Sequence, residues 1–465
     1  MSEIQKQPNV LMIMTDQQRW DGVGINGNPH IRTPHFDAIA RDGISLAHHY
    51  TAAMACVPSR ACLMTGQHTH VNGANYTSRN RWIQPGTPTL PGCFSAHGYF
   101  TAGVGKMHST PWYALDGFDR RVFMESQCDA WKGTGEDDYG VMMSQLGLLD
   151  KTIGHHTPGF GKAYKSMPCP LPPELHLDGY TGKRGVDVLE ELIAQPKPFF
   201  LTVSFTGPHE PFDPPAPYDT MYDPRAMPLG HWRDGELNCL PERIYRTIVD
   251  MGIEHLNYTA VPEEKKREMI AYYYGKISLI DDCVGRLTDT LKRHGLYEDT
   301  IILCTSDHGE YLGDHNTYGK SDFPCESDCR VPLLLKAPGI HGDGKRDTLV
   351  SHVDIMPTLL EAAGLPIPST CQGMPLLPLI RGEVKDTRDC VVTYSEAGPC
   401  YRLRTREWAY VYRSEPGHDQ LYYLPDDPHE LHNLADTAPG APMQGQLRNR
   451  LLAWFVENQA PSYME

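Results

Sequence analysis

The chain has 465 residues, enough to bury a large core, and this length corresponds to one large α/β domain with an appendage or to two or three smaller domains. Apolar residues make up 40% and charged residues 22% of the chain, the composition of an ordinary globular protein. The formal net charge of -16 disfavours a nucleic-acid partner, because an acidic field repels phosphate groups.

The N-terminal residues carry no pattern of a targeting signal. A basic region followed by an apolar stretch is missing, and the apolar run at residues 10–14 is too short for a signal segment or a membrane span. The 13 cysteines are odd in number and irregularly spaced, which fits reduced thiols better than a disulfide framework. We therefore expect a cytoplasmic protein without a membrane partner.

The first predicted element is a buried parallel strand over residues 8–14, a continuous apolar run followed by Thr15, Asp16 and Gln17. In open α/β sheets, ligands bind beyond the carboxyl ends of the strands. Asp16 is therefore a candidate metal ligand, and the alternative is that it caps the turn that follows. Gln17 offers an amide oxygen, which can also bind a hard cation although it brings no charge.

A predicted helix over residues 33–43 and a strand over residues 44–50 lead to the most informative segment. It starts at Cys56, continues with a Pro-Ser-Arg step that ends in Arg60, and closes in Thr-Gly. We predict a helix from the proline onward, whose N-terminus favours an anion beside Cys56. The alternative is that Cys56 is a buried thiol at a helix start and Arg60 a surface cation.

Two further strands are predicted to end in basic side chains. Residues 99–105 lead to Lys106 and His108, which can point the same way and clamp one oxyanion. Residues 198–205 lead to His209 within a Pro-His-Glu-Pro element. The alternatives are a solvated lysine beside a loop histidine for the first pair, and a rigid turn histidine for His209.

A long amphipathic helix is predicted over residues 263–293, followed by a strand over residues 300–306. This strand delivers Asp307 and His308, and the glycine after them allows close approach, so the two are a strong pair of ligands for a divalent cation. Lys320 follows a Tyr-Gly step, and from the residues alone it would be a surface cation.

The remaining stretches suggest loops and a small second unit. Residues 127–198 and 212–262 are rich in loop signals and are expected to shape substrate entry. Towards the C-terminus we predict a helix near residues 443–456 and short strands over residues 391–395, 401–406, 409–413 and 420–424. We therefore expect a large α/β domain at residues 1–385 and a small α+β subdomain at residues 386–465 packed on it.

The segment from Cys56 to the Thr-Gly step resembles the sulfatase signature. The Gly-Lys-x-His element at Lys106 and the run over residues 421–434 also resemble this family, so that the similarity to formylglycine-dependent sulfatases of the alkaline phosphatase superfamily covers nearly the whole chain. The resemblance implies a large mixed, mostly parallel sheet sandwiched by helices, plus a small C-terminal antiparallel sheet with a helix. It also implies that a formylglycine-generating maturation enzyme oxidises Cys56, and that the product hydrolyses sulfate monoesters.

The same resemblance implies one divalent cation at the reactive residue. Its ligands are implied to be Asp16, Asp307, His308 and the formylglycine made from Cys56, with Gln17 as a further ligand. This hard ligand set favours Ca²⁺, and the histidine makes Mn²⁺ the second choice. No nucleotide or organic cofactor is expected.

Five other residues match the family's substrate-handling positions. Arg60 is implied to hold the hydrate and balance the acids, Lys106 to bridge the nucleophile and the sulfate, and His108 to take the hydrate proton. His209 and Lys320 are implied to bind sulfate and to ease departure of the alcohol oxygen, one of them as the acid.

Two other functions stay open at this point. Gln17 and His308 also fit a phosphonate or phosphate ester hydrolase of the same superfamily, whereas Lys106 with His108 speaks for sulfate. The second is a non-catalytic binding protein in which Cys56 is never oxidised. The sequence does not decide whether the substrate is a small-molecule or a saccharide sulfate ester, nor whether the chain is a homo-oligomer.

Overall fold

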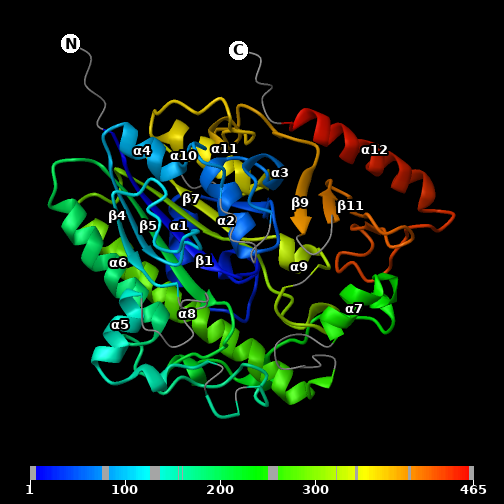
Figure 1. Ribbon diagram of the computed structural model, residues 1–465, viewed down its shortest axis with the longest axis horizontal. Helices are drawn as coiled ribbons and strands as arrows, with labels where there is room; N and C mark the ends of the chain where they lie inside the picture. The colour runs from blue at the N-terminus through cyan, green and yellow to red at the C-terminus, as the bar shows by residue number, and fades with distance from the viewer. Residues whose placement is uncertain are drawn as a thin grey trace.

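The computed structural model describes nine segments of the chain, residues 7–75, 83–125, 137–154, 157–159, 161–249, 260–320, 322–340, 344–395 and 400–459. They contain an eight-stranded sheet in the order β4-β3-β5-β1-β6-β7-β2-β8 and a four-stranded sheet in the order β12-β11-β10-β9. Both sheets and the helices around them are seen in Figure 1. The predicted fold class is confirmed.

The large sheet is built around β1 (Asn9–Asp16), whose residues are all buried. β1 pairs in parallel with β5 (Phe199–Pro208) on one side and with β6 (Thr300–Ser306) on the other. The other strands of this sheet are β2 (Ile44–Tyr50), β3 (Phe100–Gly105), β4 (Arg120–Phe123), β7 (Leu333–Lys336) and β8 (Gly344–Ser351). Only β7 runs antiparallel to its neighbours, so the described sheet is mixed but mostly parallel.

Alternate side chains of β1 enter two different hydrophobic cores, because successive strand residues face opposite sides of a sheet. Leu11 and Ile13 pack with residues of α1 (Pro34–Asp42), α5 (Asp138–Gln145), α6 (Leu177–Ile193) and α8 (Glu263–Arg293). Met12 and Met14 pack on the opposite face with residues of α2 (Cys56–Thr65), α4 (Leu90–Ala96), α10 (Ile355–Ala362) and α11 (Leu377–Ile380). The sheet is therefore covered by helices on both faces, as Figure 1 shows.

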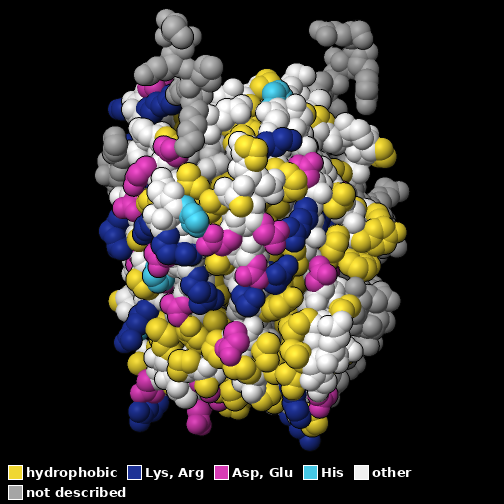
Figure 2. Space-filling model, turned by 90° about the vertical axis from the view of Figure 1, so that its left-hand side faces the viewer, with side chains coloured by type: hydrophobic (Ala, Val, Ile, Leu, Met, Phe, Trp, Pro, Cys, Tyr) yellow, Lys and Arg dark blue, Asp and Glu magenta, His cyan; other side chains and the backbone are white. Residues whose placement is uncertain are grey.

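The short helices α3 (Thr69–Asn72), α7 (Glu242–Val249) and α9 (Glu326–Cys329) lie in the connections. No helix in the described part of the chain is long and apolar enough to cross a membrane. On the face of the molecule that Figure 2 shows, acidic and basic side chains are intermixed.

The small sheet consists of β9 (Val391–Ser395), β10 (Cys400–Arg404), β11 (Trp408–Arg413) and β12 (Gln420–Tyr423), all antiparallel. The C-terminal helix α12 (Ala441–Glu457) covers it, with Leu447, Leu451 and Trp454 in the shared core. Backbone hydrogen bonds of Tyr394 with Ala52 and Met54 join β9 to the segment just before α2. The division at residue 385 stays a prediction, but the small sheet directly supports the start of α2.

We expect Trp454→Ala to lower the free energy of unfolding by about 3 kcal/mol, because a buried aromatic side chain leaves a cavity. Trp454 is 6% exposed, and its ring also contacts His68 of the large domain with ring centroids 4.7 Å apart. Urea unfolding followed by circular dichroism measures the change as a lower midpoint. Leu452→Ala on the same helix is the control, since that side chain is 59% exposed; an equal shift for both variants would contradict the packing role.

The prediction that residues 127–198 form loops is wrong where the structure has helices, at α5 and at α6. The glycines of α6 are close-packing positions rather than loop signals. A Cβ at Gly182 would come within 2.5 Å of the Cys283 side chain on α8, and one at Gly185 within 3.1 Å of Val203 on β5. The same residue type that marks turns in a sequence here lets α6 approach the sheet and α8.

Candidate active site

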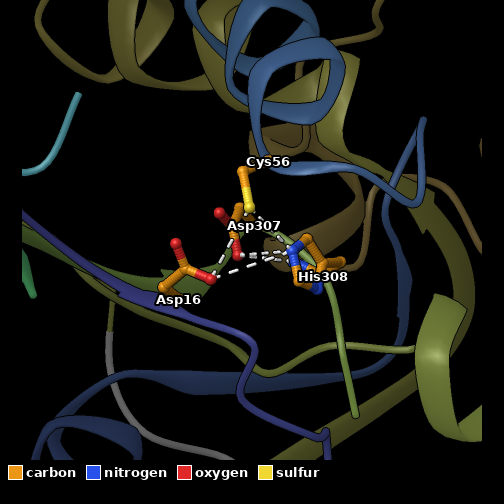
Figure 3. A group of neighbouring side chains, drawn as sticks. All are labelled: Asp16, Cys56, Asp307 and His308. Atoms are coloured by element: carbon orange, nitrogen blue, oxygen red, sulfur yellow. Dashed lines mark hydrogen bonds and ion pairs between the residues drawn. The ribbon is translucent and has the colours of Figure 1, made fainter. Parts of the chain in front are cut away.

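The site lies where the carboxyl ends of the parallel strands meet the N-terminus of α2. Asp16 is the last residue of β1, and Lys106 comes directly after β3. His209 comes directly after β5, and Asp307 and His308 come directly after β6. Cys56 is the first residue of α2 and lies opposite these strand ends. Its thiol points towards them (Figure 3). Residues almost 300 positions apart are thus brought together by the sheet.

Four of these side chains form one buried cluster. The potential ligand atoms of Asp16, Cys56, Asp307 and His308 all lie within 4.8 Å of one another. The Cys56 Sγ atom is 3.2 Å from His308 Nε2 and 3.8 Å from Asp16 Oδ1. His308 Nδ1 lies 3.0 Å from the carbonyl oxygen of Gly309, to which it can only donate, so its Nε2 presents a lone pair to the cluster.

Arg60 holds both carboxylates from the side away from His308. Its Nε donates to Asp307 Oδ2 at 2.8 Å and its Nη2 to Asp16 Oδ2 at 3.2 Å. Its Nη1 donates to the carbonyl of Lys106 at 2.6 Å and to the Ser204 hydroxyl at 2.9 Å. Arg60 is fully buried, so it is no surface cation, and the two Oδ1 atoms are left facing His308 Nε2 at 3.8 and 3.7 Å.

Two lysines contact members of the cluster. Lys106 Nζ lies 2.5 Å from Asp16 Oδ2, and Lys320 Nζ donates to Cys56 Sγ at 3.2 Å and to Gln17 Oε1 at 3.0 Å. Burial by itself raises the pKa of the Asp16 carboxyl, but Lys106 outweighs it together with other cationic groups and holds that pKa well below its ordinary value. Burial and the Asp16 carboxylate raise the pKa of the Cys56 thiol to about 11.

The surroundings of the two candidate histidines disfavour the charged form of each ring. Burial lowers the pKa of His108 well below its ordinary value, and the backbone there has a φ of 58°, a strained conformation for a residue with a side chain. Burial lowers the pKa of His209 to about 3. His209 Nδ1 lies 2.8 Å from the carbonyl oxygen of Glu210, and its backbone N–H donates to the carbonyl of Asp16 at 3.0 Å.

Gln17 lies beside the cluster, with its amide between two glutamates and Lys320. Its Nε2 donates to Glu210 Oε2 at 2.9 Å and to Glu310 Oε2, while its Oε1 accepts from Lys320. Sequence reasoning missed Glu210 and Glu310. The available signal was their position directly beside His209 and two residues after His308, but nothing in the sequence indicates that they share one amide.

The N-terminus of α2 points at the same place. Its N-cap residue is Ala55, which has no side-chain acceptor for the first N–H groups. Pro58 in the first turn brings no N–H group. The positive end of the helix is therefore available to an anion at Cys56.

Two other groups in the described segments bring three potential metal ligands together, and both already have a structural role. In the first, Asp213 Oδ1 is 3.0 Å from Lys276 Nζ, which also donates to the carbonyls of His209 and Pro211. In the second, Asp281 accepts from two backbone N–H groups at the start of α1. A cation in the first group would meet the lysine's charge.

Comparisons with known proteins agree with this geometry. The family model "Sulfatase" matches residues 8–365, and the model "N-sulphoglucosamine sulphohydrolase, C-terminal" matches residues 313–457. An arylsulfatase from Clostridium perfringens is 32% identical, with 92% of this chain and 90% of the relative covered. A choline-sulfatase from Rhizobium meliloti is 30% identical, with 95% and 85% covered.

Among solved structures, a phosphonate monoester hydrolase of Agrobacterium radiobacter superposes with a TM-score of 0.84 at 24% identity, covering 97% of this chain and 96% of the other. At that identity the likeness shows the fold alone. The family match covers residues 8–365, and the curated relatives cover nearly the whole chain. The chain therefore belongs to the sulfatase family, the enzymes that hydrolyse sulfuric esters.

Proposed function

We propose that the reactive form of this sulfatase carries formylglycine at position 56, made from Cys56 by a maturation enzyme, and uses its hydrate as the nucleophile. The observation that carries this proposal is the cluster in which Cys56 meets two carboxylates and a histidine, with two lysines in contact with its members. As a hydrate, the group offers one hydroxyl to attack sulfur and a second whose deprotonation releases the sulfate.

The donor set of the cluster fits one divalent cation. Two carboxylates, one neutral imidazole nitrogen and the position of the Cys56 side chain supply the ligands, and Gln17 would join them through Oε1. The oxygen donors favour Ca²⁺, and His308 makes Mn²⁺ the second choice. Bound there, the cation would polarise a sulfate oxygen and acidify the attacking hydroxyl.

The side chains around the cluster have separate tasks. Arg60 keeps Asp16 and Asp307 charged and fixes which oxygens face the cation. Lys106 lies against Asp16, where it would bridge the nucleophile and a sulfate oxygen. His108, neutral and buried, takes the proton from the hydrate.

Lys320 and His209 act on the substrate. Lys320 lies 3.2 Å from the Cys56 Sγ atom, and so an oxygen of a sulfate attacked from this position comes within its reach. Lys320 carries the positive charge that binds the sulfate, and it protonates the departing alcohol oxygen. His209 would take the role of this acid only once the negative charge of the bound sulfate has raised its pKa and protonated it. Lys106, Lys320 and Arg60 together give an acidic chain the local cationic pocket that an anionic ester requires.

The substrates are small-molecule or saccharide sulfate esters. The names of the two relatives, an arylsulfatase and a choline-sulfatase, support small aryl and alkyl sulfates among them. We expect an aryl sulfate to be hydrolysed faster than the matching aryl phosphonate monoester, because the Lys106 and His108 positions match sulfatases. Comparing kcat/KM for the two esters tests this, and a much faster phosphonate reaction would favour the alternative function.

Mass spectrometry of the Cys56 peptide tests the modification. We expect the aldehyde in protein from a host that contains a formylglycine-generating enzyme, and the unmodified thiol in protein from a host that lacks one. Activity is expected to follow the modified fraction. An unmodified thiol in active protein would refute the proposal.

We also propose that the chain functions in the cytoplasm, where its maturation enzyme must then act. The described cysteines are free of disulfide bonds, which suits a reducing compartment. Fractionation of the source cells, followed by detection of the chain, tests this location.

A further inference from the structure

A buried chain of hydrogen bonds links Glu310 to Lys320 through the side chain of Gln17. Glu310 Oε2 accepts from Gln17 Nε2, and Gln17 Oε1 accepts from Lys320 Nζ at 3.0 Å. The same ammonium group donates to Cys56 Sγ at 3.2 Å. Glu310 and Gln17 are fully buried, so water does not compete for these contacts.

The two glutamates fix the orientation of the Gln17 amide. Its Nε2 lies against a carboxylate oxygen of Glu210 and one of Glu310, while its Oε1 faces the ammonium group of Lys320. In the flipped amide, the oxygen would meet two carboxylates and the NH₂ group would meet a cation. Only one orientation satisfies all three partners, so a carbonyl dipole is aimed at Lys320.

Glu310 also holds the backbone next to Lys320. Its Oε1 accepts from the N–H groups of Leu312, at 3.0 Å, and Gly319. The carbonyl of Gly319 accepts from the N–H of Tyr311 at 3.0 Å, which closes the loop. Lys320 is the next residue after Gly319. The Glu310 carboxylate therefore holds the backbone just before Lys320 and also the Gln17 amide that pairs with the Lys320 ammonium group.

We propose that Glu310 is a positioning residue for Lys320, acting by way of Gln17 Oε1 and the Gly319 N–H. This inference rests on the proposed role of Lys320 in binding sulfate and assisting departure of the alcohol. Glu310 itself does not touch the thiol or the substrate position. It ties the segment that carries His308 to the loop that carries Lys320, and thereby sets the distance between the metal ligands and the sulfate-binding ammonium group.

The variant Glu310→Gln tests the inference with little change of shape. Its amide can still accept from the loop N–H groups, but its NH₂ group then meets Gln17 Nε2, and two donors oppose each other. Gln17 must turn, and Lys320 loses its carbonyl partner. We expect kcat/KM for an aryl sulfate to fall by about 10- to 100-fold, because a displacement of about 1 Å at a reacting centre costs up to this much.

A double-mutant cycle separates positioning from a general structural effect. If Glu310 acts on Lys320, Glu310→Gln lowers kcat/KM by less than about threefold in the Lys320→Ala background, since the group it positions is gone. Gln17→Leu removes the side-chain carbonyl that accepts from Lys320, and we expect its effect on kcat/KM to depend on Lys320 in the same way. It is the second test variant if Glu310→Gln folds poorly. Glu263→Gln, at an exposed position of α8, is the control that keeps wild-type activity.

Equal losses from Glu310→Gln in the wild-type and Lys320→Ala backgrounds would overturn the inference, as would wild-type kcat/KM in both Glu310→Gln and Gln17→Leu. A Lys320→Ala variant with full activity would overturn it as well. Bound metal per chain and melting temperature are measured for each variant. Kinetics are compared at saturating Ca²⁺, because Gln17→Leu and the turned Gln17 of Glu310→Gln both withdraw the Oε1 atom that is proposed as a metal ligand. These outcomes differ from a failure of the proposed function. In that case the matured wild-type protein itself would not hydrolyse sulfate esters.

Discussion

Cys56→Ala is expected to lower kcat for an aryl sulfate by at least about 10⁴-fold, because removing a covalent nucleophile leaves only binding and electrostatic stabilisation. The thiol occupies the point where His308 Nε2 at 3.2 Å, Lys320 Nζ at 3.2 Å and Asp16 Oδ1 at 3.8 Å converge. Alanine removes the side chain that all three of these groups contact. Steady-state kinetics on matured protein measure the loss.

Cys62→Ala is the matched control for this prediction. Cys62 lies in the same helix and is also buried, but its thiol accepts from Asn72 at 3.7 Å and is not part of the four-residue cluster. Its replacement should leave kcat near the wild-type value. Cys56→Ala with more than about a tenth of wild-type kcat would show that another residue supplies the nucleophile.

The positions of Asp16, Lys106, His209 and Asp307 could be predicted because they follow apolar runs of strand length. A continuous apolar run that ends in a polar residue indicates a buried parallel strand, and parallel strands place their carboxyl ends at one edge. β2, β6 and α8 have the predicted bounds, since in each the apolar pattern and the end signals agree. In these elements the local apolar pattern agrees with the buried position in the fold, so the sequence alone predicts their bounds.

The hydrogen bonds of Gln17 could not be predicted. Glu210 lies 193 and Glu310 lies 293 residues away along the chain, and no local pattern records that both reach one amide. The helix α6 was missed for a related reason, because its glycines act through neighbours on α8 and β5. Long-range packing decides such features, and residue type alone does not show it.

The arrangement also explains how an acidic protein handles an anionic ester. Arg60, Lys106 and Lys320 are drawn into the buried site by Asp16, Asp307 and Gln17, which pair with them at 2.5 to 3.2 Å. Each carboxylate therefore has two functions, as a partner of a buried cation and as a ligand facing the cluster. Replacing one of them disturbs both the cationic pocket and the metal.

Asp307→Asn is accordingly expected to weaken Ca²⁺ binding by at least about 10-fold and to lower kcat by about 10³-fold, the loss that corresponds to about 4 kcal/mol of transition-state stabilisation by the cation. In the wild type, Asp307 Oδ2 accepts from Arg60 at 2.8 Å, and Oδ1 accepts from the N–H groups of Gln17 at 3.0 Å and His308 at 2.9 Å. All of these partners are donors, so the NH₂ group of an asparagine meets a donor in either orientation.

Ca²⁺ titration by calorimetry and metal analysis after dialysis measure the first effect, and kinetics at saturating Ca²⁺ measure the second. We expect excess Ca²⁺ to restore occupancy but only part of kcat, because the contact with Arg60 stays altered. Asp289→Asn, at an exposed position of α8, serves as the control with wild-type metal content. If Asp307→Asn bound Ca²⁺ with unchanged affinity and kept its kcat, Asp307 would be no ligand, and the cation would have to lie outside the four-residue cluster.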